Sequence, residues 1–351
     1  MAGMTHSELD PARVAAILES FATQHIVVVG DMVADEYIFG TPGRISREAP
    51  VLVLEYTGRR LVPGGATNVA VNLRALGAAV SVVGVIGDDP SGRELAEALA
   101  ALGVDTGGLV VDSRRPTSTK TRVVGGGAQV VRQQMVRIDR ADSSPVQGAS
   151  RHELFTAADH LLARAGGLIL SDYEHGVIDP ELIDCCLTWH RRREMVTTVD
   201  AHGDLSRFRG VSLATPNQPE AEATLGRLLP DLPALREGGR ELLDRMDSAG
   251  LLITRGSLGM VVLDREGLFE ALPACQVSEV LDATGAGDTV SAVATLALGG
   301  GATFMEAAIL GNLAAGLVVQ RLGAATVSLG ELASAASLRS SLGEKIFDQG
   351  T

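Results

Sequence analysis

Short apolar runs alternate with amphipathic stretches through most of the chain. Residues 26–29 contain only Ile and Val, and residues 79–86 are rich in Val, a pattern typical of strands that are covered on both faces. Between them, residues 64–76 carry apolar side chains at helical spacing. Asp10-Pro11 supplies an N-cap followed by a proline suited to the first helical turn. The alternation predicts a largely parallel sheet with helices on both faces.

The same alternation resumes after residue 150. We expect further strands at four apolar runs: 166–170, 195–199, 211–214 and 251–254. We expect late helices at 285–298 and 302–322. The sequence contains no repeat and no low-complexity linker, so residues 1–351 are expected to form a single α/β domain with three α/β/α layers.

Two regions depart from this alternation, at about residues 40–57 and 109–140. Residues 51–56 and 117–124 are β-rich, and residues 129–138 are half-polar and strand-like. No helical period separates the last two segments. We therefore expect a small β-sheet that lies over the α/β body as a lid.

Composition narrows the class of protein. Of the 351 residues, 46% are hydrophobic but only 3% are aromatic, so the core must be built from Val, Leu, Ile and Ala. The net charge is −13, and only two of the 30 basic residues are lysines. A strongly acidic chain is a poor partner for nucleic acid or an anionic membrane. Any anionic ligand must therefore be held by a local cluster of cations.

The cysteines and the apolar runs favour a cytoplasmic protein. Cys185 and Cys186 are neighbours and Cys275 is distant, so we expect free thiols in a reducing compartment. The first residues lack a basic start followed by an apolar run, and no stretch of eighteen apolar residues occurs. Neither a signal peptide nor a membrane span is therefore expected.

The most informative motif is D-A-T-G-A-G-D-T at residues 282–289, directly before a helical run. Backbone N–H groups of Gly285, Ala286 and Gly287, together with the helix N-terminus, would form an anion hole for a transferring phosphoryl group. Asp288 lies at its mouth, where a carboxylate can accept the proton of an attacking hydroxyl. The alternative is a glycine-rich helix start that Asp288 merely caps.

This motif resembles the C-terminal signature of the ribokinase/PfkB family of sugar kinases, and P-G-G-A-T-N at residues 63–68 resembles its N-terminal signature. The resemblance spans about residues 26–332. It implies a ribokinase-like body with a β-lid, the use of ATP and Mg²⁺, and a sugar held by four residues: Asp31, Gly64, Gly65 and Asn68. The alternatives are that Asp31 caps a turn and that Asn68 is an ordinary polar helix residue.

The resemblance also implies a nucleotide site. Asn217-Gln218-Pro219-Glu220 resembles the family's N-x-x-E motif, in which Asn217 belongs with phosphate and Glu220 with Mg²⁺. A helix start is the alternative there. The stretch 254–259 resembles a turn that borders the nucleotide, although its glycines also suit a plain hairpin. The remaining implied ATP-binding residues are Thr254, Gly256, Gly259, Thr284 and Asn312.

Within the family, one subgroup matches further. R-I-S-R-E-A-P at residues 44–50 and L-S-D-Y at residues 170–173 resemble segments of heptose 7-phosphate kinases, as do residues 119–122 and 137–139. A phosphorylated sugar needs cationic partners. The implied substrate-binding residues are Arg44, Lys120, Arg122, Arg137 and Asp172. Ordinary solvent-facing charge on a half-exposed sheet is the alternative for each basic residue.

Two positions depart from the subgroup. Those kinases usually carry lysine where this chain has His175 and His202. Because histidine titrates near pH ~6.5, a constant positive charge becomes a conditional one. The printed sequence also contains only the kinase half of the bifunctional relatives, so no nucleotidyltransferase activity is expected.

The expected reaction is ATP-dependent phosphorylation of the anomeric hydroxyl of D-glycero-β-D-manno-heptose 7-phosphate, which gives the 1,7-bisphosphate. A kinase for another sugar or sugar phosphate (ribose, fructose 6-phosphate) or for a nucleoside is the alternative within the fold. A non-catalytic sugar-binding protein is the alternative outside catalysis. Since sugar kinases of this family often pair through the lid, and natural proteins cover open sheet edges, we also expect a homodimer.

Overall fold

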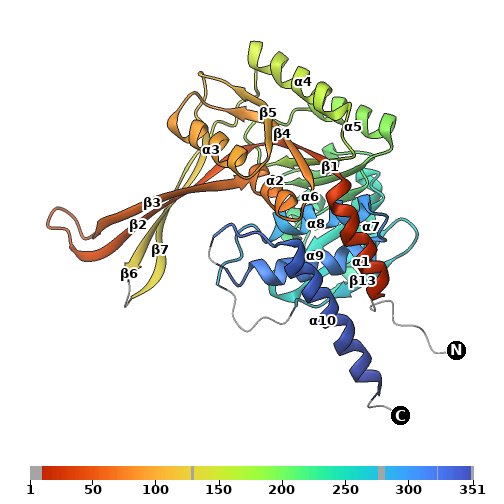
Figure 1. Cartoon of the computed structure of the whole chain (residues 1–351). Helices are drawn as coiled ribbons and strands as arrows, with labels where there is room; N and C mark the ends of the chain where they lie inside the picture. The colour runs from red at the N-terminus through yellow and green to blue at the C-terminus, as the bar shows by residue number, and fades with distance from the viewer. Residues whose placement is uncertain (1–9, 128–129, 276–280, 322, 349–351) are drawn as a thin grey trace.

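Two β-sheets organise the chain (Figure 1). The computed structural model describes residues 10–127, 130–275, 281–321 and 323–348. The larger sheet has nine strands in the order β13-β12-β11-β10-β9-β8-β1-β4-β5, and the smaller has four in the order β3-β2-β6-β7. All pairings in the larger sheet are parallel except those of β12 and β13. The expected ribokinase-like fold, with a mostly parallel sheet and a smaller second sheet, is confirmed.

The large sheet comprises β1 (His25–Gly30), β4 (Ala79–Ile86), β5 (Asp105–Val111), β8 (Gly167–Asp172), β9 (Val196–Ala201), β10 (Leu213–Ala214), β11 (Gly250–Thr254), β12 (Met260–Asp264) and β13 (Phe269–Leu272). The small sheet comprises β2 (Met32–Ile45), β3 (Leu52–Gly65), β6 (Ser118–Gly127) and β7 (Val130–Arg140). The helices are α1 (Pro11–Ser20), α2 (Ala66–Ala75), α3 (Pro90–Ala101), α4 (Gly148–Leu162), α5 (Pro180–Arg193), α6 (Gln218–Leu225), α7 (Leu232–Met246), α8 (Ala286–Gly299), α9 (Phe304–Val318) and α10 (Leu329–Asp348).

The strand β1 shows why helices cover both faces of the large sheet. Successive side chains of a strand point to opposite faces. Ile26 and Val28 belong to a core shared with α1, α2, α8 and α9, whereas Val27 and Val29 belong to a second core shared with α4, α5 and α7. All four side chains are buried, so the uninterrupted apolar run is what a strand between two helical layers requires.

The small sheet forms the lid, and its boundaries differ from the expected ones. Residues 109–111 belong to β5, which pairs with β4 at the edge of the large sheet. The lid strands also begin earlier and end later than residues 40–57, because β2 follows β1 after a single residue and β3 runs directly into α2. At its base, the lid is therefore continuous with β1 and α2 of the α/β body (Figure 1).

Three further details were not expected from the sequence. The helix α2 begins at Ala66, because Gly64 and Gly65 still pair with β2 and Gly65 has a φ of 53°. The strands β12 and β13 add an antiparallel edge to the large sheet. The helix α10 packs against α1 and α9. Within the described residues, no helix has the length and apolar character that crossing a membrane demands.

Candidate active site

A cavity of about 660 Å³ opens beyond the carboxyl ends of the central strands, beside the N-terminus of α8. This is the position at which ligands bind in open parallel sheets. Ten of the site residues proposed from the sequence line it: Asn217, Glu220, Thr254, Gly256, Gly259, Gly285, Ala286, Gly287, Asp288 and Asn312. The implied nucleotide residues therefore come together, with the exception of Thr284, which does not line the cavity.

The N-terminus of α8 lies at the cavity, and one of the three N–H groups expected to form an anion hole there is already engaged. Gly285 has a φ of 80°, and a Cβ there would lie 2.6 Å from Nδ2 of Asn68, so only glycine suits this turn. The Ala286 N–H donates to the carbonyl of Ala283, while the first helical hydrogen bond comes from the Thr289 N–H. The N–H groups of Gly287 and Asp288 lie between these two and point out of the helix end.

Asp288 is held by two side chains from distant parts of the chain. Its Oδ2 accepts a 2.6 Å hydrogen bond from Nδ2 of Asn68, and its Oδ1 accepts a 2.9 Å hydrogen bond from the Tyr173 hydroxyl. Burial raises the pKa of Asp288, whereas these two hydrogen bonds and the nearby Lys120 lower it. The amide of Asn68, expected on a sugar hydroxyl, is thus engaged with the carboxylate.

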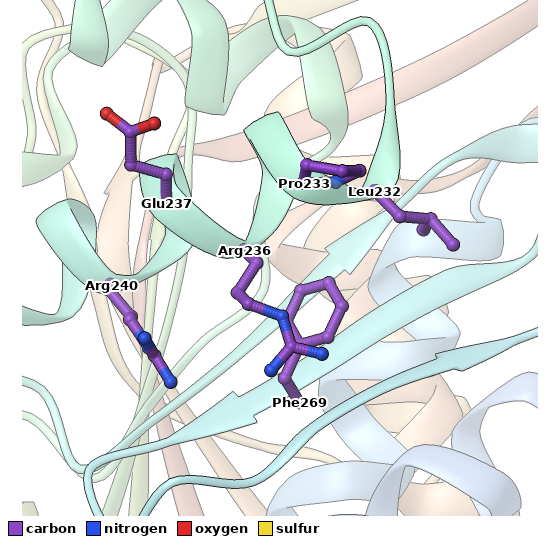
Figure 2. A pocket seen from close by; sticks show the side chains of 6 residues that line it. All are labelled: Leu232, Pro233, Arg236, Glu237, Arg240 and Phe269. Atoms are coloured by element: carbon purple, nitrogen blue, oxygen red, sulfur yellow. The ribbon is translucent and has the colours of Figure 1, made fainter.

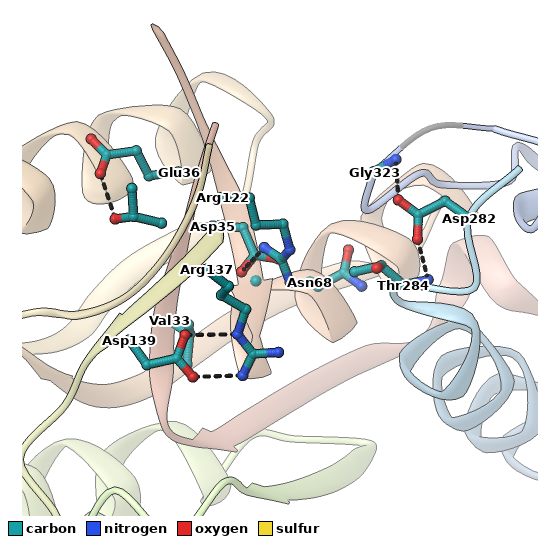
Figure 3. A network of polar contacts seen from close by, with 12 residues as sticks. Val33, Asp35, Glu36, Asn68, Arg122, Arg137, Asp139, Asp282, Thr284 and Gly323 are labelled. Carbon is teal, nitrogen blue, oxygen red and sulfur yellow. Dashed lines mark hydrogen bonds and ion pairs between the residues drawn. The ribbon is translucent and has the colours of Figure 1, made fainter. Parts of the chain in front are cut away.

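The lid strands carry charged side chains, among them Asp35, Arg122 and Arg137, on the side of Asn68 (Figure 3). Lys120 pairs in register with Asp35 of β2, and Arg122 pairs with Arg137 of β7. Nη1 of Arg122 lies 2.9 Å from Oδ1 of Asp35, and both side chains are at least nine-tenths buried. These two atoms make no hydrogen bond of good geometry within the described structure, so each retains capacity for a ligand.

Asp35 was not among the residues proposed from the sequence. A Cβ on Gly64 would lie 2.7 Å from the Asp35 carboxyl carbon, so the glycine allows the carboxylate to lie against the start of α2. The only signal was its position, four residues after Asp31 in D-M-V-A-D. Asp35 therefore lies beside Gly64, one of the residues expected to hold the sugar.

Asp31 was expected to bind the sugar, but its carboxylate instead accepts hydrogen bonds from the backbone of the loop after β8. Its Oδ2 accepts hydrogen bonds from the N–H groups of Tyr173 and His175, at 2.7 and 3.1 Å, and Oδ1 accepts a longer one from Val177. Its side chain is 1% exposed. The carboxylate is occupied by backbone donors, because the loop after β8 closes over the end of β1.

Asp172 was also expected to bind the substrate, but its carboxylate too is buried and engaged within the protein. Its side chain is also 1% exposed; Oδ1 accepts from the Glu174 N–H and Oδ2 lies 3.2 Å from Arg207. Burial and the neighbouring Asp31 raise the pKa of Asp172 to about 6. It supports the loop after β8 and does not line the cavity.

Three other residues that were expected to bind a ligand have different surroundings. Arg44 is exposed near the end of the β2–β3 hairpin, where it pairs with Val53. The backbone N–H of Thr284 donates to Asp282, which tightens the turn before α8 (Figure 3). Asn312 faces the cavity, but its Nδ2 donates to the carbonyl of Pro273, which leaves its Oδ1 for a ligand.

The predicted metal residue is also a helix cap. Oε2 of Glu220 accepts from the Asn217 N–H at 2.8 Å, and Oε1 lies 2.6 Å from Nδ1 of His202. This contact raises the pKa of His202. Asp200, which the sequence reasoning missed, also faces the cavity, and burial raises its pKa to about 8. D-A-H-G at residues 200–203 was the only signal for it.

These carboxylates suit an ion that arrives with a nucleotide. Across the described ranges, no group of three or more His, Cys, Asp or Glu side chains is arranged to hold a metal. Mg²⁺ commonly binds through one or two carboxylates together with substrate phosphates and water. Glu220 and Asp200 meet that requirement, and Glu220 would reach the ion through water because both its oxygens are engaged.

The two histidines that replace lysine differ in their surroundings. His202 lines the cavity, and its ring meets the Tyr173 ring edge-on at 4.5 Å between centroids. His175 does not line the cavity, and burial lowers its pKa. Of the two, only His202 lies at the cavity beside the N-terminus of α8.

A second hollow, of about 460 Å³, lies between α7 and β13 (Figure 2). The guanidinium of Arg236 stacks on the Phe269 ring at 4.1 Å. The residues that line it are Leu232, Pro233, Arg236, Glu237, Arg240 and Phe269. None of the expected site residues is among them, so the chemistry is assigned to the larger cavity.

Comparison with known proteins shows the family of the chain. Residues 23–330 match the family model described as pfkB family carbohydrate kinase. The chain is 41% identical over 307 residues to the bifunctional protein HldE of Geobacter metallireducens, a match that covers 87% of this chain and 61% of the relative. It is 38% identical to the corresponding protein of Pelobacter propionicus, over 94% and 67% of the two chains. The chain therefore spans about three fifths of the Geobacter relative.

Solved structures share the fold. Arabidopsis thaliana ribokinase complexed with ribose and ATP superposes with a TM-score of 0.70 at 19% identity, covering 89% of this chain and 98% of the ribokinase. Phosphofructokinase-2 of Escherichia coli in complex with fructose-6-phosphate gives a TM-score of 0.72 at 19% identity, over 90% and 99% of the two chains.

Proposed function

The chain belongs to the pfkB family of carbohydrate kinases, and we propose that its acceptor is D-glycero-β-D-manno-heptose 7-phosphate, phosphorylated by ATP at the anomeric hydroxyl. The observation that carries the proposal is the position of Asp288. Its carboxylate lies between the cavity at the N-terminus of α8 and the charged inner face of the lid. ATP in the cavity and a sugar under the lid would meet at this residue.

The reaction follows from that position. Asp288 accepts the proton of the acceptor hydroxyl as the oxygen attacks the γ-phosphorus, and the bond from that phosphorus to the bridging oxygen of ADP breaks. The N–H groups of Gly287 and Asp288 and the N-terminus of α8 stabilise the charge on the transferring phosphoryl group. Asp35 and Arg122 bind sugar hydroxyls, because their free donor and acceptor sites lie under the lid.

Mg²⁺ bound with ATP supplies charge neutralisation of the phosphates. Glu220 and Asp200 would hold it, the first through water. His202 holds the Glu220 carboxylate at 2.6 Å and thereby fixes its direction at the edge of the cavity.

A phosphate on the acceptor explains the cations of the lid. Burial lowers the pKa of Lys120, while Asp35 and Asp288 raise it. Arg137 makes a bidentate contact with Asp139, at 2.7 Å and 2.5 Å. Asp35 pairs with Arg122 and Asp139 with Arg137, so Lys120 is the cation of this face that has no ion pair among the described residues. A buried phosphate needs such a cationic partner. The identity with the HldE proteins supports a heptose phosphate as that acceptor.

A side-by-side kinase assay tests the acceptor. The substrates are heptose 7-phosphate, ribose and fructose 6-phosphate, each with ATP and Mg²⁺, and the readout is kcat/KM. We expect the heptose phosphate to exceed the other two by at least an order of magnitude, because each lost charge-assisted contact costs about 1.5–3 kcal/mol. A higher kcat/KM for ribose or fructose 6-phosphate would reject the heptose proposal.

We also propose that two copies pair through the lid. Large apolar side chains stand exposed on the lid strands and on the turn between β2 and β3: Ile45, Val51, Leu52, Tyr56, Met135, Val136 and Ile138. The strands β3 and β7 are the open edges of that sheet. A monomer rarely exposes such a patch beside open edges, and a second lid offers matching apolar surface.

A further inference from the structure

Tyr173 occupies a central position that the proposed reaction has not used. It lies in the loop after β8, and its backbone N–H is fixed by Oδ2 of Asp31 at 2.7 Å. Its ring is contacted from two sides: Nζ of Lys120 lies 4.4 Å from the ring centroid, and the His202 ring meets it edge-on. Main chain and ring are therefore both held in place, and the hydroxyl has a defined direction.

The hydroxyl is directed at Asp288. It lies 2.9 Å from Oδ1, while Asn68 occupies Oδ2. A carboxylate has about four lone-pair sites, so each oxygen keeps one site for the proton of the acceptor. Two donors on opposite oxygens also fix the rotation of the carboxylate, which a base must keep to meet a hydroxyl in line with the γ-phosphate.

The phenol acts as a donor and not as a second base. Burial and the Asp288 charge raise the pKa of Tyr173 well above its usual value, so it stays protonated over the working range of an enzyme. A hydrogen bond to a charged carboxylate favours the charged form. The other charged groups that face Asp288 are Asp35 from β2, Lys120 from β6 and Asp200 from β9.

We infer that Tyr173 is a positioning residue for the transfer reaction: its hydroxyl orients the Asp288 carboxylate and keeps it in the charged form that accepts a proton. The inference rests on the proposed role of Asp288 as the base. Asp31 contributes indirectly, because its carboxylate accepts a hydrogen bond from the Tyr173 backbone N–H and so holds Tyr173 in place. The aspartate that ends β1 thus supports the base through the loop after β8.

The test is the pH profile of kcat for Tyr173→Phe, with ATP, Mg²⁺ and heptose 7-phosphate at saturation. This change removes one oxygen and retains the ring contacts with Lys120 and His202. We expect kcat to fall on the order of tenfold. The acidic limb should move to higher pH by about one unit, because Asp288 loses a donor that favours its charged form. A purely structural role would lower the rate without moving the limb.

Tyr37→Phe is the matched control. The Tyr37 hydroxyl is buried, and within the described residues it has no hydrogen-bond partner. We expect its acidic limb to stay at the wild-type pH. An acidic limb of Tyr173→Phe that coincides with that of wild type would overturn the inference. Full activity of Asp288→Asn would instead remove the proposed base itself, so the two failures are distinguishable.

A spectroscopic measurement covers the case in which Tyr173→Phe does not fold. The chain has three tyrosines, and phenolate formation is visible by ultraviolet absorption. In Asp288→Asn the negative charge beside the Tyr173 hydroxyl is gone, so one tyrosine should titrate at lower pH than in wild type. Identical tyrosine titrations in the two proteins would contradict the contact on which the inference depends.

Discussion

The side-chain amide of Asn68 donates a 2.6 Å hydrogen bond to Oδ2 of Asp288, although 220 positions separate the two residues in the chain. This bond joins the start of α2 to the start of α8, which are the two glycine-rich helix N-termini that the sequence singled out. It brings the lid base and the anion hole to one point.

Asp288→Asn should retain the fold and ATP binding but lose turnover. The change is isosteric and removes the proton acceptor, and general-base catalysis typically contributes about 10²–10⁴-fold to the rate. Steady-state kinetics and a nucleotide-binding titration measure the two properties. Asp244→Asn, an exposed change on α7, is the control. A kcat within a factor of about three of wild type would be incompatible with the proposed base.

Gly285→Ala should lower kcat more than its backbone strain alone explains. The new Cβ would lie 2.6 Å from Nδ2 of Asn68 and would displace the amide from Asp288. Gly210→Ala is a close control, since Gly210 has a φ of 81° against 80° for Gly285 and its Cβ would meet nothing within 4 Å. Both variants should be destabilised by about 1–2 kcal/mol, but only Gly285→Ala should lose activity. Equal activities would argue against a role for the Asn68 contact.

Asp35→Asn should weaken the acceptor and leave the nucleotide unaffected. Asp35 forms a buried ion pair with Arg122, and its Oδ1 makes no hydrogen bond within the described residues. We expect KM for the sugar to rise on the order of tenfold or more, because a charge-assisted contact is worth about 1.5–3 kcal/mol, while KM for ATP stays unchanged. A rise in KM for ATP alone would contradict a role of Asp35 in binding the acceptor sugar. Thermal melting should accompany the kinetics, because an unpaired Arg122 is destabilising.

Asp172→Asn should change how stability depends on pH. The pKa of Asp172 is raised to about 6 in the folded protein, from a usual value of 3.8, first by burial and then by Asp31. A raised folded pKa means that the folded state gains stability from the protonated form, and this contribution is lost as pH rises from about 4 through 6. Urea unfolding at pH 4.5 and pH 7 should therefore show the variant improving, relative to wild type, at the higher pH. A pH-independent difference between the two proteins would refute this reading of the Asp31–Asp172 pair.

Val136→Lys together with Ile138→Lys should prevent the lid from pairing. Both side chains are about half exposed, at 48% and 58%, so the changes are compatible with the lid fold but place two charges on the proposed interface. Light scattering should give twice 36.4 kDa for wild type and 36.4 kDa for the variant. A wild-type monomer at micromolar concentration would reject the proposed dimer.

The sequence by itself determined the layered body and singled out the start of α8 as a candidate anion site. The apolar run of β1 implied helices on both faces because every side chain in it is apolar, whichever way it points. Likewise, the glycine-rich stretch before α8 indicates a candidate anion site locally, since the free N–H groups of a helix start favour anions. The expected helix start at Gly64 was wrong, because Gly64 and Gly65 pair with β2 and the helix begins at Ala66.

Only the tertiary structure decided which carboxylates are free. Asp31, Asp35 and Asp172 all lie near strand ends or in the lid, and nothing in their own sequence neighbourhoods distinguishes them. Asp31 is used by N–H groups more than 140 positions later, and Asp172 by Arg207 from another loop. Asp35 lies against Gly64 with Arg122 as its ion-pair partner, and its Oδ1 makes no hydrogen bond within the described residues. Availability for a ligand depends on partners that long-range folding supplies, so no local pattern encodes it.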